Sequence, residues 1–302
     1  MIDKDLALTQ KKCDLAAEDL NAFYRSLASL AERLKPAWRF QISCEPGQSH
    51  QFLTADSLRN AFAYQVGVAA ENFLARERRE GKPWPDIRSF IESSSDPKEQ
   101  DIRKNYVRLL AWGSLKGKFL EALCLMATLS RLIPLEAQKN VDAFGTVGPL
   151  KVRDQDRTCF LWSRPIIESQ HSGLNAVPDI VITSTPDRVS TTNILSIIEC
   201  KCRQTIHAAD LRGEFGKAYD LGSPSYVLVS YYDVQEIIVA AGRELGIDVQ
   251  VFSLSTSDRE QFVRGERDIG EDMAVKLLNA RTRRTFLAAL ENRAADVRRR
   301  AT

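Results

Sequence analysis

An acid and a base stand two residues apart in the apolar segment 197–202, IIECKC, as Glu199 and Lys201. Alternate side chains of an extended strand point to the same face, so this pair leaves one face while Cys200 and Cys202 leave the other. A carboxylate beside an ammonium group can hold a metal ion and stabilise charge that develops on a phosphate. The pattern alone decides little, because about two acid-x-Lys matches are expected by chance. Three occur, at 80–82, 96–98 and 199–201.

The spacing of two apolar segments adds a second carboxylate. Segments 179–184 and 194–202 are predicted to be strands joined by the polar connection 185–193. An antiparallel pairing centred on residue 189 places Asp179 opposite Glu199, where Cβ atoms are about 4.5–5.5 Å apart. Two carboxylates that close repel each other unless a cation lies between them. The rival pair, Asp86 and Asp96, is centred on no recognisable turn, and Asp96 before Pro97 is typical of a helix cap.

Glu121 is the single charged residue in the apolar run 119–129, within an expected helix. Burying a lone carboxylate is costly unless it is paired or faces a metal ion. Two interpretations stay open. Glu121 belongs to the same site as Asp179 and Glu199, or it forms an ion pair at the helix edge with one of the bases Lys116, Lys118 and Arg131.

Glu121 on a helix, Pro178-Asp179 opening a strand, Glu199-x-Lys201 ending the next, and a helix from about 207 to 221 together resemble the PD-(D/E)XK nuclease superfamily. The resemblance covers roughly residues 115–255. It implies a restriction-endonuclease-like fold, with Asp179 and Glu199 as metal ligands, Lys201 as the catalytic lysine and Glu121 as the helical acid. It also implies Mg²⁺ as the cofactor, with Mn²⁺ as an alternative. One departure is the long stretch 133–178 between the helix and Pro178, which weakens the assignment of Glu121.

The activity implied by the resemblance is endonucleolytic hydrolysis of phosphodiester bonds, in restriction, phage defence or DNA repair. The chemistry of the backbone does not distinguish DNA from RNA, so an RNA-cleaving effector stays open, although DNA is favoured as the partner. A further alternative is a non-catalytic nucleic-acid-binding or assembly module. Walker-type phosphate loops are absent from the sequence, so any energy-coupled partner is expected to be a separate protein.

Basic residues cluster in three places although the net charge is only +2. Arg212 and Lys217 on the 207–221 helix are candidates for contacts with the phosphate backbone, with an exposed basic face as the alternative. Segment 98–118 carries six bases against two acids, and segment 281–302 carries seven Arg against two acids. In the last segment, Arg298, Arg299 and Arg300 are predicted to contact nucleic acid.

A spacing of seven predicts a long first helix. Its stripe consists of Leu6, Cys13, Leu20, Leu27 and Leu34, with Thr9, Ala16, Phe23 and Leu30 between them. The stripe is expected to pack in a hairpin against a second helix over 57–80, or to form a homodimer. Residues 81–95 are rich in Gly, Pro and Ser and are interpreted as a linker. A helix is then expected from Pro97 to Leu132, with an interruption at Gly113.

These features predict an α/β protein with a mixed sheet flanked by helices, preceded by an all-helical region. The expected domains are 1–95 (helical), 96–268 (nuclease) and 269–302 (basic helix). The 302 residues are 44% hydrophobic and 27% charged, as in ordinary globular proteins. Without a bilayer-length apolar run or a secretion signal, a cytoplasmic protein with no membrane association is expected. Six Cys and three His favour reduced thiols over disulfides or a zinc site.

Overall fold

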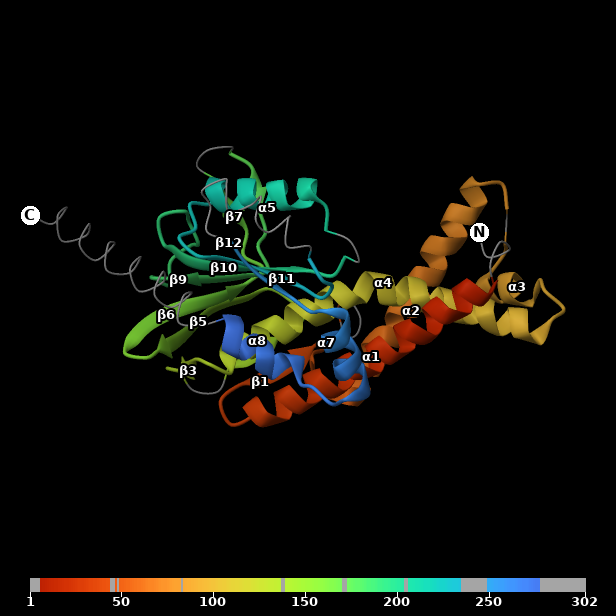
Figure 1. Ribbon diagram of the computed structural model, residues 1–302, viewed down its shortest axis with the longest axis horizontal. Helices are drawn as coiled ribbons and strands as arrows, with labels where there is room; N and C mark the ends of the chain where they lie inside the picture. Colours follow the sequence, from red (N-terminus) through yellow and green to blue (C-terminus); the bar gives the residue numbers. More distant parts are fainter. Residues whose placement is uncertain are drawn as a thin grey trace, which may run out of the picture.

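The chain forms a mixed α/β structure in which one large sheet lies between layers of helices (Figure 1). A computed structural model provides the coordinates, and it describes residues 6–43, 47, 49–82, 84–136, 139–169, 173–203, 206–234 and 249–277. No helix among these residues is long and apolar enough to cross a bilayer. The cysteines at positions 13, 124, 159, 200 and 202 form no disulfide among the described residues.

The large sheet has seven strands in the order β12-β11-β10-β9-β6-β5-β3. β10, β11 and β12 run parallel, and the pairs from β10 through β9, β6 and β5 to β3 are antiparallel. The strands are β3 (Ile133–Pro134), β5 (Val147–Asp154), β6 (Arg157–Ser163), β9 (Ile180–Thr183), β10 (Ile194–Lys201), β11 (Tyr226–Ser230) and β12 (Val249–Ser253). Short apolar segments in the sequence also predict strands over 159–163, 225–232 and 247–254. Together with 179–184 and 194–202 they correspond to β6, β9, β10, β11 and β12, whereas β3 and β5 were not predicted.

Two smaller sheets flank the large one, and the sequence analysis identified neither. One has the order β2-β1-β4, from Gln51–Phe52, Arg39–Ile42 and Asn140–Asp142. The other pairs β7 (Ile167–Glu168) with β8 (Asn175–Ala176). These strands have two to four residues each, which is too short for an alternating pattern to be recognised.

Helix α5 (Ala208–Asp220) connects the parallel strands β10 and β11 and covers one face of the large sheet, as expected for the 207–221 segment. It ends before Gly222, whose positive φ of 57° suits a glycine after a helix. The opposite face is covered by α4 (Pro97–Leu129) and α8 (Ile269–Leu277), with α1 (Leu6–Leu34) and α7 (Thr256–Arg264) packed on this layer. Figure 1 shows α5 and α4 on opposite sides of the sheet.

Helix α4 is continuous, so the predicted interruption at Gly113 is wrong. Its start is as predicted, because Asp96 caps it by accepting a hydrogen bond from the Lys98 amide and Pro97 lies in the first turn. Trp112 and Leu115, on either side of the glycine, are buried. Their packing outweighs the roughly 1 kcal/mol that a glycine costs inside a helix.

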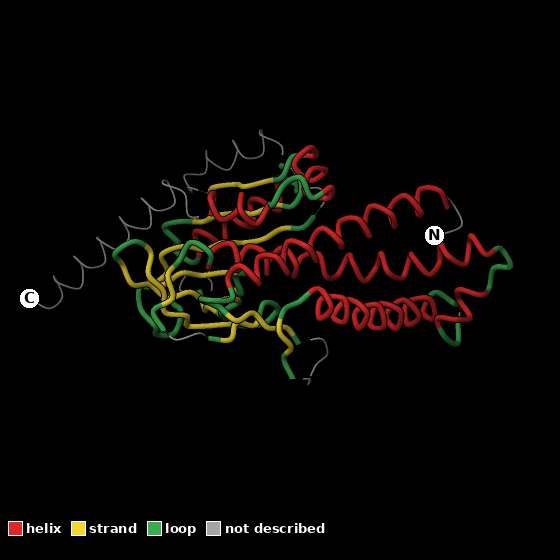
Figure 2. The backbone as a smooth tube through the Cα atoms, turned by 90° about the horizontal axis from the view of Figure 1, so that it is seen from below, coloured by secondary structure: helices red, strands yellow, loops and turns green. Residues whose placement is uncertain are grey.

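The apolar stripe of α1 packs mainly on α4, and not on α2 (Ala55–Arg79) as the hairpin prediction had it. α4 lies between the two, so the three long helices run side by side away from the sheet (Figure 2). The stripe residues Cys13, Leu20 and Leu27 are buried by this packing, and a dimer through the same stripe would have to displace α4. A homodimer through other faces of these helices stays a prediction.

The hydrophobic core does not divide at residue 95. Phe23 of α1 contacts the rings of Trp112, Phe119, Tyr231 and Phe262, which belong to α4, the end of β11 and α7. One continuous cluster therefore includes the N-terminal helix and the sheet. The 81–95 segment also contains a short helix, α3 (Ile87–Glu92), which the linker interpretation missed. The C-terminal segment is described only as far as α8, so Arg298, Arg299 and Arg300 lie outside the described residues.

Candidate functional site

The start of β9 and the end of β10 bring Asp179 and Glu199 together in the predicted register. Ile198 pairs with Ile180 and Ile197 with Val181, so the pairing is centred on residue 189 and its continuation places Asp179 level with Glu199. The Cys200 amide donates to Asp179 Oδ2 at 2.7 Å, and the Asp179 amide lies 3.4 Å from Glu199 Oε2. The carboxylates therefore meet where the buried strands end.

Glu199 is only 4% exposed and is neutralised by two lysines. Its Oε1 atom accepts hydrogen bonds from Lys201 Nζ at 3.0 Å and from Lys217 Nζ at 2.8 Å. Glu199 and Lys201 share the face of β10 that α5 covers, whereas Cys200 and Cys202 pack against the larger core on the other face. This is the alternation predicted for the 197–202 segment.

Glu214 and Tyr226 complete the cluster, and the sequence analysis identified neither. Glu214 Oε1 lies 2.9 Å from Lys201 Nζ, and Glu214 Oε2 accepts a hydrogen bond of 2.6 Å from the buried Tyr226 hydroxyl. Burial alone lowers the pKa of Lys201, but Glu199 and Glu214 outweigh it and raise that pKa above the ordinary value of a lysine. Lys201 therefore remains an ammonium group at neutral pH.

The two α5 bases occupy different places. Lys217 is partly buried in the carboxylate cluster, where it pairs with Glu199. Its contact with a phosphate backbone stays a prediction. Arg212 is exposed, and its assignment as a phosphate contact stays a prediction. Glu214 and Lys217 are three residues apart, so on a helix they lie on the same face. This spacing is the only sequence signal that could have placed the two residues in one site.

Asp179 and Glu121 form the part of the cluster that no lysine reaches within 4 Å among the described residues. Burial, together with the nearby Glu199 and Glu121 carboxylates, raises the pKa of Asp179 to about 7, and the Cys200 amide and Lys201 oppose this shift. Burial likewise raises the pKa of Glu121, with Arg164 opposing and Glu199 adding to the shift. Glu121 forms no ion pair within the described parts of the chain, so the alternative of a helix-edge salt bridge is wrong.

Arg164 is a further residue that the sequence analysis missed. It follows β6, and its amide donates to the carbonyl oxygen of Asp179 at 2.8 Å. Its φ of 53° lies in the left-handed region, which is uncommon for a residue with a side chain. Of the basic groups, Arg164 has the strongest electrostatic effect on Glu121. The guanidinium therefore contributes positive charge to the Glu121 side of the cluster.

The carboxylate pair fits a divalent cation that is only partly held by protein. Within the described residues, no group of three or more His, Cys, Asp or Glu side chains is arranged to hold a metal ion. Mg²⁺ is commonly bound through one or two carboxylates, with waters and phosphate oxygens completing the octahedron. Asp179 and Glu199 provide such a pair. The pKa of Asp179 is raised first by burial and then by the neighbouring Glu199 and Glu121 carboxylates, and a bound cation would oppose both effects.

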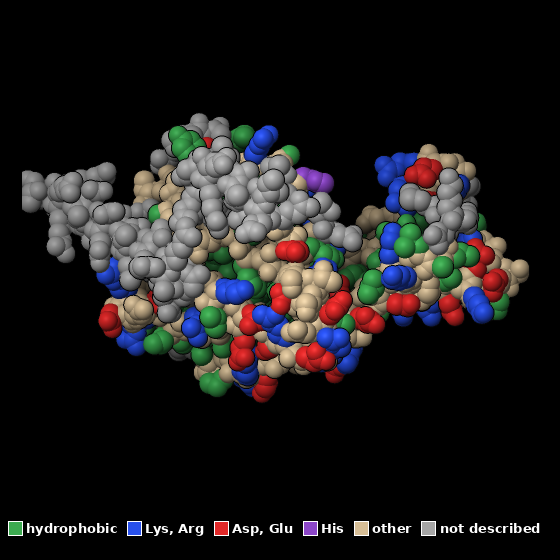
Figure 3. Space-filling model, in the orientation of Figure 1, with side chains coloured by type: hydrophobic (Ala, Val, Ile, Leu, Met, Phe, Trp, Pro, Cys, Tyr) green, Lys and Arg blue, Asp and Glu red, His purple; other side chains and the backbone are tan. Residues whose placement is uncertain are grey.

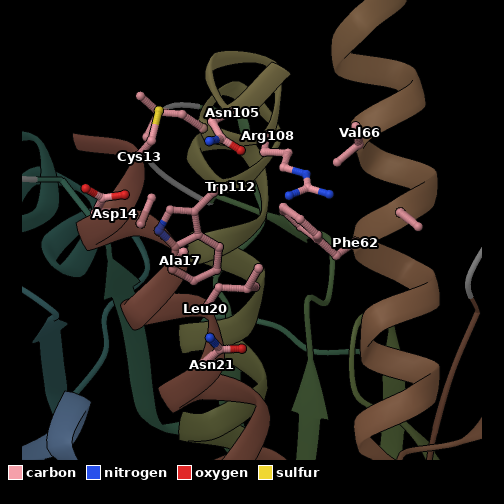
Figure 4. Close-up of a pocket in the computed structure, with 13 residues that line it drawn as sticks. Cys13, Asp14, Ala17, Leu20, Asn21, Phe62, Val66, Asn105, Arg108 and Trp112 are labelled. Carbon is pink, nitrogen blue, oxygen red and sulfur yellow. The ribbon is translucent and has the colours of Figure 1, made fainter. Parts of the chain in front are cut away.

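Two hollows in the surface relate differently to this cluster. A small one of about 80 Å³, lined by Lys201, Glu214 and their neighbours, adjoins it. A larger one of about 360 Å³ lies between α1, α2 and α4, where Trp112, Phe62 and Leu20 meet the polar Arg108 and Asn105 (Figure 4). No residue of the carboxylate cluster lines the larger hollow.

The charge on the face of the molecule shown in Figure 3 is mixed rather than segregated. On the face shown in Figure 3, Lys and Arg side chains alternate with Asp and Glu over the described helices, without a continuous basic stripe. In the 98–118 stretch, Arg103 is paired with Glu99.

Comparisons with protein-family models, with curated proteins and with solved structures find no match for this chain.

Proposed function

We propose that the protein is a Mg²⁺-dependent endonuclease of the PD-(D/E)XK type, with a restriction-endonuclease-like fold and with DNA favoured over RNA as its substrate. The observation that carries the proposal is the register of β9 and β10, which places Asp179 beside Glu199 with Lys201 in contact. A role in restriction, phage defence or DNA repair, and action together with a separate partner protein, belong to the same proposal.

The chemistry assigned to each residue follows from its type and surroundings. Asp179 and Glu199 would hold Mg²⁺, which polarises the scissile phosphate and lowers the pKa of a bound water when it is present. Lys201 stays protonated and is positioned to stabilise charge that develops on the phosphate oxygens. Glu214 and Tyr226 fix Lys201 in place. Glu121 adds negative charge and so favours retention of a cation.

A second candidate is a non-catalytic module in which the cluster is a structural ion-pair network. The specific observation in its favour is that two side chains of the protein itself, Lys201 and Lys217, already neutralise Glu199. Buried ion pairs of this kind do occur without catalysis. Such a module would bind nucleic acid or a partner protein without cleaving it.

A cleavage assay separates these functions. Wild-type protein is incubated with supercoiled duplex DNA, single-stranded DNA and RNA, each with Mg²⁺, with Mn²⁺ or with a chelator. We expect metal-dependent cleavage of duplex DNA, and a loss of at least about 100-fold in Lys201→Ala and Glu199→Ala. Lys35→Ala, which removes an ion pair to Glu32 of 3.1 Å far from the cluster, is the matched control.

Three outcomes would change the proposal. Preferential cleavage of RNA would replace DNA as the substrate. Nucleic-acid binding without cleavage would favour the non-catalytic module. Wild-type cleavage by a folded Lys201→Ala variant would show that the reaction takes place elsewhere in the chain.

A further inference from the structure

The two lysines at Glu199 are held to different degrees. Lys201 is bonded to both Glu199 and Glu214, and Glu214 is fixed in turn by Tyr226. Lys217, within the described parts of the chain, contacts Glu199 alone, at 2.8 Å. Breaking one ion pair therefore frees Lys217, whereas freeing Lys201 requires two.

The position of Lys217 conflicts with the entry of a divalent cation. Lys201 and Lys217 both lie within 3.0 Å of one oxygen, Glu199 Oε1. A cation between Asp179 and Glu199 would add two positive charges beside these two ammonium groups. Like charges repel strongly where little water screens them, and Glu199 is only 4% exposed. The most weakly held of the cations should leave.

We propose that Lys217 is an exchangeable counter-cation. It neutralises Glu199 while the site lacks metal, leaves Glu199 when a divalent cation binds, and then contacts a phosphate of the nucleic acid. This inference rests on the proposed function, because it requires a metal site at Asp179 and Glu199.

The location of Lys217 on α5 allows the exchange. Its side chain is 22% exposed, so the ammonium can reach solvent by rotation of its own stem without unpacking α5. The α5 face below it is fixed by the buried Leu211, Phe215 and Ala218. A lysine carries a compact charge on a flexible stem, which suits a group that changes partner.

The test is Mn²⁺ binding, followed by the electron paramagnetic resonance signal of free Mn²⁺. Wild type is compared with Lys217→Met, with Lys217→Gln as a second variant and Lys35→Met as the matched control. We expect both position-217 variants to bind Mn²⁺ roughly tenfold more tightly, because a competing charge is removed. The KM for duplex DNA should rise several-fold in the same variants, because a phosphate contact is lost. Circular dichroism and melting temperature establish that each variant is folded.

A second measurement uses the unmodified side chain. In protein labelled with ¹³Cε-lysine, addition of Mg²⁺ should shift and sharpen the Lys217 resonance as it leaves the ion pair. The Lys201 resonance should broaden less, because Glu214 retains it. The Lys217 resonance is assigned by its absence from the Lys217→Gln spectrum.

The outcomes distinguish the inference from the proposed function. If wild type binds no Mn²⁺ and cleaves nothing, the metal site and the inference both fail. If wild type binds Mn²⁺ and cleaves DNA but the position-217 variants bind Mn²⁺ equally or more weakly, only the inference fails, and Lys217 is a structural partner that holds Glu199. An unchanged KM in tight-binding variants would overturn the contact with phosphate.

Discussion

The two faces of the large sheet differ in what they bury. Under α4, the core consists of large apolar side chains such as Phe23, Phe119 and Leu123, all inaccessible to solvent. Under α5, a smaller apolar core ends where Glu199 and Glu214 pair with Lys201 and Lys217, with Asp179 beside Glu199. Charges are retained at the end of the smaller core because lysine stems reach solvent there. Stability should therefore depend mainly on the α4 face, and chemistry on the α5 end.

The largest effect is expected from Phe23→Ala on the α4 face. Its ring is fully buried against four other aromatic rings, and truncation of such a residue costs about 3–5 kcal/mol of unfolding free energy. Urea denaturation measures the loss. The control is Leu15→Ala on the same helix, whose side chain is 53% exposed and should change stability by less than about 0.5 kcal/mol.

Removal of residues 1–95 extends the same test. Because α1 shares its core with the sheet, we expect an insoluble product. A soluble, cooperatively folding remainder would show that the α4 face does not need α1, and would restore the domain boundary that the sequence suggested at residue 95.

Local patterns predicted the Asp179–Glu199 pair because the two strands are close in sequence. The polar connection 185–193 fixes the centre of the pairing, and alternation then fixes the face on which Glu199 and Lys201 lie. No long-range information is needed for either inference. The helix predicted over 207–221 was likewise found from the local sequence alone, and it is α5.

The remaining parts of the site depend on packing that no local pattern encodes. Glu214 and Lys217 enter the site only because α5 is rotated so that both face β10, and Tyr226 resembles an ordinary core residue of a strand. Similarly, the seven-residue stripe of α1 shows that one face is apolar but not which helix covers it. The partner, α4, lies more than 60 residues further along the chain.

Asp179→Asn should change stability in a pH-dependent way. The pKa of Asp179 is about 7 in the folded protein and near 3.8 when unfolded, so the folded state binds this proton more tightly. The contribution of Asp179 to wild-type stability is thus fully present below about pH 4 and is lost as the pH rises through about 7, whereas the Asn variant lacks this contribution. One pKa unit corresponds to about 1.36 kcal/mol, so the gain at pH 8 has an upper bound of about 4 kcal/mol.

Melting temperatures from pH 4 to pH 8 measure the difference. Asp14→Asn, an exposed acid on α1, is the control. Added Mg²⁺ should raise the melting temperature of wild type more at pH 8 than at pH 5, and should have no such effect on Asp179→Asn. Parallel pH profiles for the two proteins would contradict the raised pKa of Asp179.

Tyr226→Phe should have a smaller effect on the α5 end of the sheet. The substitution removes the 2.6 Å hydrogen bond to Glu214 and leaves that carboxylate with Lys201 alone. We expect a loss of about 1–2 kcal/mol in stability and a fall in cleavage of about 3- to 10-fold, because Lys201 is less well positioned. Tyr64→Phe on α2 is the control. If stability falls while kcat and KM are unchanged, Tyr226 supports the core only.

The smallest effect on stability is expected from Arg164→Gly. This substitution should also separate stability from cleavage activity most clearly. Glycine adopts the φ of 53° without steric cost, and the amide bond to the Asp179 carbonyl is kept. The relief of strain and the greater entropy of an unfolded glycine oppose each other, so stability should stay within about 1 kcal/mol of wild type. Loss of the guanidinium leaves the Glu121 side of the cluster more negative toward an approaching phosphate.

Cleavage by Arg164→Gly should therefore fall about 3- to 10-fold while the melting temperature is preserved. Gln155→Gly is a closely matched control, because Gln155 has the same φ of 53° in the turn between β5 and β6, away from the cluster. Steady-state kinetics and thermal melts on the two variants show whether Arg164 contributes to cleavage. Equal cleavage by both would mean that Arg164 serves the turn alone, and the electrostatic part of the site would then end at Glu121.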